Sequence, residues 1–297
     1  MIRVPCGVGM LALLCTSMAY GDWPVFRGDA LMTGMGNAKL PDQLEERWTF
    51  KTGDTIESAP AVVDGTVYVS SLDKHLYAID LANGKQKWKT KLSFMKASPS
   101  VKDGRVYIGD LEGRFYCLNA ADGKVAWKFE ADGEIHASAN FHGSNIIFGS
   151  HDSNLYCLSP DGKKVWAAQV DGPINAATAI VGDRAFATGC SDGILHVIDA
   201  KNGKELGSID LVGQSVATAA VVDDRLYASM VSNQVVAARI WLGRTPRALL
   251  RVTLALRRGT GNGPSVPVGP APWPMCADAP GRTDDEASAG ALASARA

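Results

Sequence analysis

The sequence carries almost no net charge and no paired cysteines. Its 297 residues include 30 basic and 31 acidic side chains, which gives a formal net charge of −1. Because a balanced chain presents no strong basic surface, we expect neither nucleic acid nor an anionic membrane as a partner. None of the six cysteines lies in a Cys-x-x-Cys pair, which excludes the common zinc-ribbon and thioredoxin motifs.

Signatures of catalysis are also missing. There is no phosphate-binding loop and no Gly-x-Ser-x-Gly elbow, and no pair of histidines has the His-x-x-x-His or His-Glu-x-x-His spacing. We therefore expect no catalytic residue, and no metal ligand among the histidines. The five histidines are His75, His136, His142, His151 and His196.

Long apolar runs are confined to the N-terminus. Arg3 is followed by apolar and small residues up to Met18, and Ala19 and Gly21 are small residues suited to cleavage before Asp22. This pattern predicts a signal peptide over residues 1–21 and a soluble protein in the periplasm or outside the cell. The run is too short to cross a bilayer, so we expect no transmembrane segment. The residues before Cys15 do not favour lipoprotein processing, and a buried N-terminal helix is the alternative interpretation.

The sequence does contain a repeat of about 40 residues. Tryptophans recur at spacings of 40, 39 and 39 residues, and turn glycines follow the same period. Residue types that share one period indicate a repeated supersecondary unit. The tryptophans are Trp48, Trp88, Trp127 and Trp166, and the glycines are Gly84, Gly123, Gly162 and Gly203.

One unit, residues 97–130, illustrates the predicted structure. Its connections contain tight-turn pairs such as Asp103-Gly104, and connections this short join antiparallel strands in a meander. A four-strand unit of about 40 residues is typical of β-propeller blades. We predict an all-β fold of four-stranded antiparallel blades, without helices over residues 46–236. The expected strands of this unit are Ser98–Lys102, Arg105–Gly109, Arg114–Asn119 and Val125–Phe129.

The segment Ala78–Trp88 resembles the A-x-D-x-x-x-G-K-x-x-W motif of the PQQ-like (pyrroloquinoline-quinone-type) β-propeller repeat family, which includes BamB-like proteins. Cys117–Trp127 and Cys157–Trp166 repeat the motif with small changes, and residues 197–207 keep it except for Gly207 in place of tryptophan. The resemblance implies a ring of seven or eight blades. It also implies that the four tryptophans are structural docking residues, each packed on a neighbouring blade with its indole N–H directed at a backbone carbonyl.

The repeat is intact only to about residue 236. All 15 lysines precede residue 205, whereas the last 61 residues contain no lysine and 8 of the 15 arginines. We interpret the segments as a signal peptide (1–21), an N-terminal segment (22–45), propeller repeats (46–236) and a non-repeat tail (237–297). We interpret the tail as the product of translation in a shifted reading frame. A genuine disordered tail and a segment that binds a membrane surface are the alternatives.

Four units and part of a fifth would form an open arc instead of a closed ring. Propellers close so that edge strands and apolar blade faces are covered. We therefore expect the isolated chain to aggregate or to fold poorly.

Two sets of residues recur once per blade and are candidates for a site. Acidic residues precede the third strand of each blade, where local hydrogen bonding in a turn explains them better than a cation-binding ring. Polar residues of varied type precede the first strand, which lines the central channel of a propeller. We predict that this second set forms a ligand-binding rim, with solvated loop ends as the alternative. The acidic set is Asp73, Glu112, Asp152 and Asp192, and the rim set is Glu57, Lys96, His136, Asn175 and Ser215.

The resemblance leads to two hypotheses about function. The first is a non-catalytic exported scaffold that binds a protein or peptide partner and needs no cofactor. The alternative is a fragment of a PQQ-dependent quinoprotein dehydrogenase, which would hold PQQ with calcium. The adjacent Cys-Cys pair of many such enzymes is missing here, and no residue matches their calcium ligands or catalytic aspartate.

Overall fold

The computed structural model of the chain describes residues 22–36, 42–191, 193–211, 214–215, 217–231 and 234–240. The predicted signal peptide and residues 241–297 of the predicted tail lie outside the described residues. Every described residue belongs to one compact unit. The described residues contain no helix, and hence no helix that could cross a membrane.

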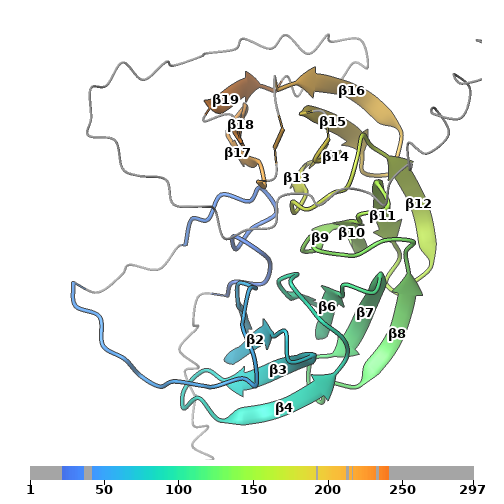
Figure 1. The fold of residues 1–297 in the computed structure, drawn as a ribbon. Helices are drawn as coiled ribbons and strands as arrows, with labels where there is room; N and C mark the ends of the chain where they lie inside the picture. Colours follow the sequence, from blue (N-terminus) through green and yellow to red (C-terminus); the bar gives the residue numbers. More distant parts are fainter. Residues whose placement is uncertain are drawn as a thin grey trace, which may run out of the picture. The chain divides into compact units, whose positions relative to one another are not determined.

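Five antiparallel sheets follow one another along the described residues (Figure 1). The prediction of an all-β fold built from four-stranded blades is confirmed, with four complete blades and three strands of a fifth. Blade 1 contains β1 (Ala61–Val63), β2 (Thr66–Ser70), β3 (His75–Asp80) and β4 (Gln86–Lys91). Blade 2 contains β5 (Ser100–Lys102), β6 (Arg105–Gly109), β7 (Arg114–Asn119) and β8 (Val125–Glu130). Blade 3 contains β9 (Asn140–His142), β10 (Asn145–Gly149), β11 (Asn154–Leu158) and β12 (Lys164–Gln169). Blade 4 contains β13 (Ala179–Val181), β14 (Arg184–Thr188), β15 (Ile194–Asp199) and β16 (Glu205–Asp210). Blade 5 contains β17 (Ala220–Val222), β18 (Arg225–Met230) and β19 (Gln234–Arg239).

Within a complete blade the first strand is innermost and the fourth is outermost (Figure 1). Two-residue turns join the first and second strands, as at Asp64-Gly65, where φ is 48° and 66°. Positive φ at both positions suits a type I′ hairpin turn, which explains the recurrent Asp-Gly pairs. The second and third strands are buried on both faces because blades pack on either side of them, whereas the fourth strand is mostly exposed.

The repeated tryptophans and glycines form one contact between successive blades. A Cβ added to Gly123 would lie 2.5 Å from Cε3 of Trp88, because the indole ring lies directly on the turn of the next blade. Each indole Nε1 also donates a hydrogen bond to a backbone carbonyl of that blade. The donor–acceptor pairs are Trp48–Leu81, Trp88–Ala120 and Trp127–Pro160 at 2.9 Å, and Trp166–Ala200 at 3.2 Å.

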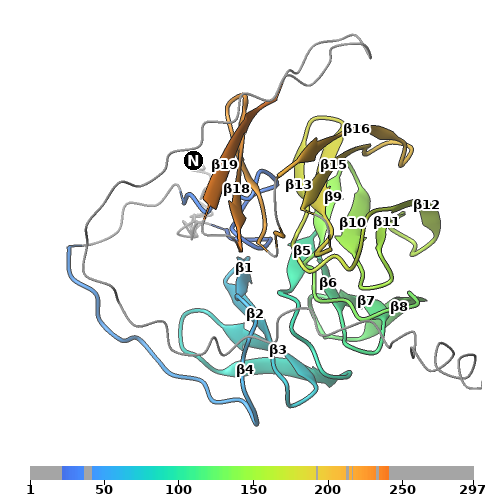
Figure 2. The same ribbon diagram turned by 45° about the horizontal axis from the view of Figure 1, so that its top comes forward.

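The N-terminal segment, residues 22–36, lies along the inner strands and forms no sheet of its own (Figure 2). The residue at the second position of four of the five first strands donates its backbone N–H to a carbonyl of this segment. In blade 3 the side-chain amide of Asn140 donates to the carbonyl of Ala30 at 2.9 Å instead. The segment thus contacts all five blades. The four backbone pairs are Val62–Trp23, Val101–Pro24, Ile180–Ala30 and Val221–Leu31, each donor given first.

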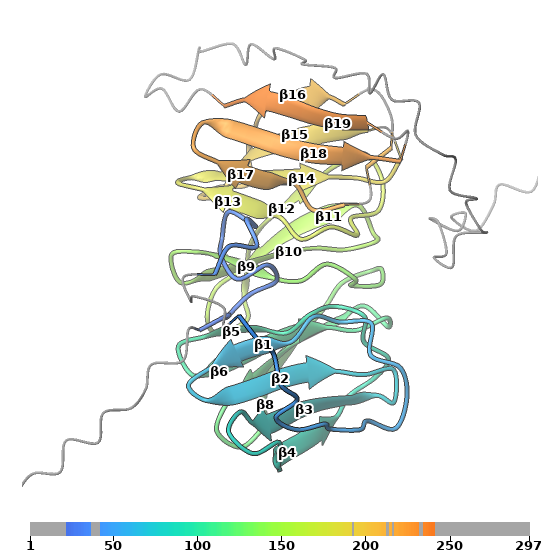
Figure 3. The ribbon, with the colours of Figure 1, turned by 90° about the vertical axis from the view of Figure 1, so that its left-hand side faces the viewer.

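Blade 5 differs from the other blades because no described residue covers one of its faces. Along β18 the burial alternates: Leu226, Ala228 and Met230 pack in the core with blade 4, whereas Tyr227 is 37% exposed. The register places Ala220 and Ala237 opposite Tyr227, so all three share the outward face. Figure 3 views the arc from the side on which β17, β18 and β19 are seen.

The third strand of blade 5 extends three residues past the predicted end of the repeat at Val236. Ala238 and Ile240 continue the buried alternation, with exposed fractions of 1% and 2%. Arg239 Nε lies 2.5 Å from Asp224 Oδ2, which pairs the end of β19 with the turn between β17 and β18. Packing therefore maintains the strand even though the repeat motif is lost.

Residues 46–51, before blade 1, lie where the fourth strand of a preceding blade would lie. Trp48 contacts blade 1 in the same way that Trp88 of β4 contacts blade 2. Phe50 packs with Trp48 against the buried residues of that blade face, including Tyr77. In the described part of the chain no strand pairs with residues 46–51. Blade 1 is thus covered by residues 46–51, which form no strand, whereas blade 5 has no fourth strand among the described residues.

Candidate functional site

The five predicted rim residues each lie four or five positions before the first strand of their blade. The structure links four of them through one additional residue, His151. Lys96 Nζ lies 3.3 Å from Glu57 Oε2, and the charge of Lys96 also acts on His136. The rings of His136 and His151 stack with centroids 4.1 Å apart and planes 7° apart. His151 Nε2 in turn donates a hydrogen bond to Asn175 Oδ1.

The fifth predicted residue does not join this group. Ser215 is buried, with 1% of its surface exposed, and its hydroxyl donates to the carbonyl of Ser229 at 3.1 Å. Since that carbonyl belongs to its own blade, the position makes a local structural contact. The connected polar cluster is therefore made by blades 1 to 4.

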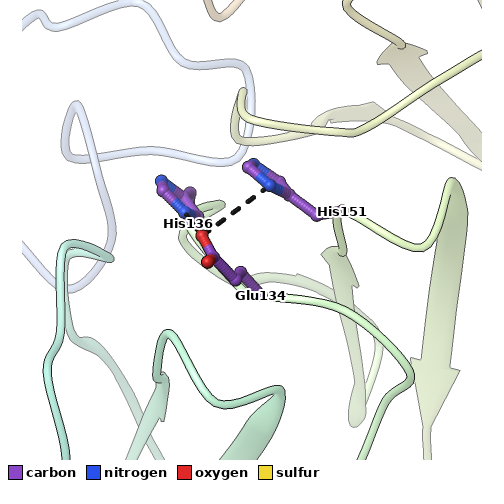
Figure 4. A group of neighbouring side chains, drawn as sticks. All are labelled: Glu134, His136 and His151. Carbon is purple, nitrogen blue, oxygen red and sulfur yellow. Dashed lines mark hydrogen bonds and ion pairs between the residues drawn. The ribbon is translucent and has the colours of Figure 1, made fainter. Parts of the chain in front are cut away.

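Glu134 and His151 are members of the cluster that sequence reasoning did not select (Figure 4). Glu134 and His136 flank the buried Ile135, so the alternation of extended backbone places both side chains on one side. His151 comes from the connection between β10 and β11, and its N–H donates to the Glu134 carbonyl at 2.8 Å. The Glu-x-His alternation at a rim position was the only signal in the sequence, and nothing local linked it to His151.

The electrostatics of the cluster centre on His136. Burial lowers the pKa of His136, and the nearby His151 and Lys96 lower it further, against the opposing effect of Glu134. His136 Nε2 lies 2.6 Å from Glu134 Oε2. A neutral imidazole at ordinary pH keeps a nitrogen lone pair that can accept a proton or bind a metal.

The acidic set before the third strands is explained by local hydrogen bonds. The Asp73 carboxylate accepts from Tyr77 Oη at 2.5 Å, from the Gly53 N–H at 2.7 Å and from the His75 N–H at 3.0 Å. Asp152 accepts from Tyr156 Oη and two backbone N–H groups in the same way. These bonds confirm the turn interpretation for the two aspartates. Blade 2 differs, because there Asp110, and not Glu112, accepts the hydrogen bond from the tyrosine hydroxyl, that of Tyr116. Asp192 of blade 4 lies outside the described residues.

Thiol chemistry is not supported by the blade cysteines. Cys117 and Cys157 are buried and form no disulfide. Burial raises the pKa of the Cys117 thiol to about 11 and that of Cys157 to about 12. Both remain protonated at neutral pH, so neither is a nucleophile.

Comparisons with known proteins identify two groups of relatives. Residues 91–253, more than half of the chain, match the family model described as outer membrane protein assembly factor BamB. Residues 37–143 match the model described as glucose/ethanol/alcohol dehydrogenase, beta-propeller domain. Quinoprotein glucose dehydrogenase from Escherichia coli (strain K12) is 37% identical over 62 residues, which are 18% of this chain and 8% of that protein.

Solved structures of both groups share the fold. BamB from Moraxella catarrhalis has a TM-score of 0.58 at 19% identity, over 65% of this chain and 63% of that one. Quinohemoprotein alcohol dehydrogenase from Comamonas testosteroni has a TM-score of 0.63 at 15% identity, over 74% and 47% of the two chains. The chain spans less than two thirds of the length of each of these proteins. Identities this low show a common fold alone.

Proposed function

The chain belongs to the PQQ-like β-propeller repeat family, and from that premise we propose that it is a non-catalytic scaffold, exported to the periplasm or beyond, that binds protein or peptide partners. The match to an assembly-factor model supports a role in binding other proteins. The partner site could lie on the rim or on blade 5. We favour the surface that lacks the covering element present in the complete blades. One observation favours blade 5: its outward face has an exposed tyrosine at the position where blades 1 and 2 have a buried tyrosine beside a tryptophan.

That tyrosine occupies a repeated position. In blades 1 and 2 the equivalent residues, Tyr68 and Tyr107, lie beside the tryptophan of their own fourth strand, with ring centroids 5.9 and 6.0 Å apart. Their exposed fractions are 4% and 5%, against 37% for Tyr227. Val235, on β19, is 62% exposed on the same face. Blade 5 therefore lacks, among the described residues, both a fourth strand and the aromatic ring that such a strand would carry.

The fourth strand that blade 5 lacks among the described residues defines what a partner must supply. The partner must provide an extended segment that pairs with the outer edge of β19 and places a large aromatic side chain on Tyr227 and Val235. Such strand addition gives affinity through backbone hydrogen bonds and specificity through alternate side chains. Residues 46–51 of this chain carry that pattern in Trp48 and Phe50, so a second copy of the chain is the partner whose chemistry fits this surface.

A peptide-binding experiment tests the proposal. The probe is a fluorescent peptide of residues 44–54, and its anisotropy is measured with the full chain. We expect saturable binding that Tyr227→Asp or Val235→Asp weakens by roughly tenfold or more, because each places an unpaired charge in the contact. Val125→Asp, at an exposed valine of the complete blade 2, is the matched control and should leave binding unchanged. Equal binding by all variants, or no binding at all, would refute this function.

The dehydrogenase hypothesis has support from the second family model and from the glucose dehydrogenase match. The described rim residues do not fit a calcium–quinone site, however. Calcium requires several oxygen ligands. Glu57 is paired with Lys96, and the Asn175 carbonyl oxygen accepts from His151. The remaining donors in the cluster are the Glu134 carboxylate and two imidazoles, which is too few oxygens for calcium. Adding PQQ and Ca²⁺ should therefore give neither a spectral change nor dye-linked oxidation of alcohols or glucose.

A further inference from the structure

The connections at one end of blade 3 bring three metal-ligating side chains together (Figure 4). Glu134 and His136 belong to the connection that enters β9, and His151 to the connection between β10 and β11. One donor atom from each lies within 4.8 Å of the other two. A zinc ion with ligands at 2.0–2.2 Å needs donor separations of ~3.3 Å, which small side-chain rotations supply from this starting arrangement.

The backbone holds these two connections in place. The His151 N–H donates to the Glu134 carbonyl at 2.8 Å, and the Ser150 hydroxyl donates to the Gly133 carbonyl at 3.0 Å. Because the first bond involves two of the three residues, the side chains begin from fixed backbone positions. The entropy lost on binding a metal is correspondingly smaller than for ligands on independent loops.

A hydrogen-bond chain orients His151 for ligation. Asn175 Nδ2 donates to Cys190 Sγ at 2.9 Å, which leaves Asn175 Oδ1 as the acceptor for His151 Nε2. With its proton on Nε2, His151 directs the lone pair of Nδ1 toward Glu134 Oε2, 3.9 Å away. Histidine ligands in metal sites are held in the same way, with the second ring nitrogen donating to an amide or carboxylate oxygen.

We propose that Glu134, His136 and His151 form a binding site for a divalent transition metal, of which zinc fits best. Two imidazoles and one carboxylate are a common zinc ligand set, and they do not suit calcium or magnesium. The side chains of His136 and His151 are 22% and 26% exposed and that of Glu134 is 50% exposed, so a fourth position is open to water or to a ligand group. The ammonium of Lys96 is paired with Glu57 and so opposes the metal charge only weakly. The site does not depend on the proposed partner-binding function.

Metal binding by the full chain tests this site directly. The protein, free of affinity tags and dialysed against chelator, is titrated with Zn²⁺ in competition with a chromophoric zinc chelator. We expect one saturable site per chain, and we expect Co²⁺ to give the visible absorption of a four-coordinate ion at the same stoichiometry. Added Ca²⁺ should not displace either metal. A wild-type chain with no saturable site would overturn the proposal.

Variants locate the metal on the chain. His136→Gln and His151→Gln should each weaken zinc binding by about tenfold or more, and Asn175→Ala by a similar or smaller factor. His142→Gln is the matched control, since His142 pairs with Asp183 away from the cluster and should leave affinity unchanged. Urea unfolding of each variant separates a lost ligand from a lost fold. Zinc affinity that is unchanged in the folded His136 and His151 variants, or that falls equally in His142→Gln, would place the metal elsewhere.

Discussion

At the scale of single residues, the contact between blades depends on a tryptophan that lies on a glycine. The repeated tryptophan and the repeated glycine were both predictable from the sequence, because they recur with one period. A large indole ring must also pack against an apolar surface. Their mutual contact across the blade boundary was predictable only through the family resemblance. The histidine cluster was half predictable: His136 recurs with the rim set, but His151 and Glu134 do not repeat between blades. Contacts that occur once leave no periodic signal.

A pair of glycine substitutions measures the docking contact. Gly123 and Gly104 have nearly the same φ, 72° and 70°, so alanine introduces similar backbone strain at both. A Cβ on Gly123 would meet the Trp88 ring at 2.5 Å, whereas one on Gly104 meets no atom within 4 Å. We expect Gly123→Ala to lower the free energy of unfolding by roughly 1–3 kcal/mol more than Gly104→Ala. Equal losses in urea unfolding would show that the indole does not pack tightly on this turn.

The aspartate clamp makes stability depend on acid pH. Burial tends to raise the pKa of Asp73, but the hydrogen bonds from Tyr77, Gly53 and His75 outweigh it and lower the pKa below its ordinary 3.8. A carboxylate whose pKa is lower in the folded chain than in the unfolded chain stabilises the fold at pH values above the unfolded-state pKa. This contribution is lost as the pH falls through the folded-state pKa. The urea midpoint should therefore decrease below about pH 4 in the wild type.

Substitution isolates the contribution of this carboxylate. Asp73→Asn should give a lower midpoint at neutral pH and a shallower decrease in acid, whereas Asp103→Asn, at an exposed hairpin turn, should follow the wild type. Parallel pH curves for Asp73→Asn and the wild type would exclude Asp73 as a source of acid sensitivity.

At the scale of elements, the strands of the repeat agree closely with the sequence pattern. Two of the four strands predicted in blade 2 have the observed bounds, and the others differ at one end. The position of residues 22–36 could not be predicted. This segment has no alternating pattern, and its partners are backbone groups far away in sequence, such as the N–H of Val221 for the Leu31 carbonyl. Backbone hydrogen bonds leave no trace in side-chain identity.

Hydrogen exchange tests the role of this segment. The amides of Val62, Val101, Ile180 and Val221 donate to it, so they should be protected in the full chain. Deleting residues 22–36 should accelerate their exchange and lower the cooperativity of unfolding, while amides between β6 and β7 exchange more slowly than these four. Unchanged protection of the four amides after the deletion would show that the segment is not what shields them.

At the scale of the whole molecule, the described blades form an arc with two different ends. The sequence predicted an open arc from the point where the repeat stops, but it did not predict that the ends are complementary. Blade 1 is covered by residues 46–51, the segment that contains Trp48. Blade 5 exposes Tyr227 and Val235, which a segment of this kind would cover. Complementary patches at different ends of one chain favour head-to-tail association.

Sedimentation velocity of the full chain over a wide range of concentration tests this account most directly. We predict that the average mass increases with concentration, and that Tyr227→Asp, Val235→Asp or an excess of the 44–54 peptide suppresses the increase while Val125→Asp does not. A wild-type chain that remains a folded monomer at every concentration, with or without the peptide, would contradict the central claim that the uncovered face of blade 5 is a binding surface.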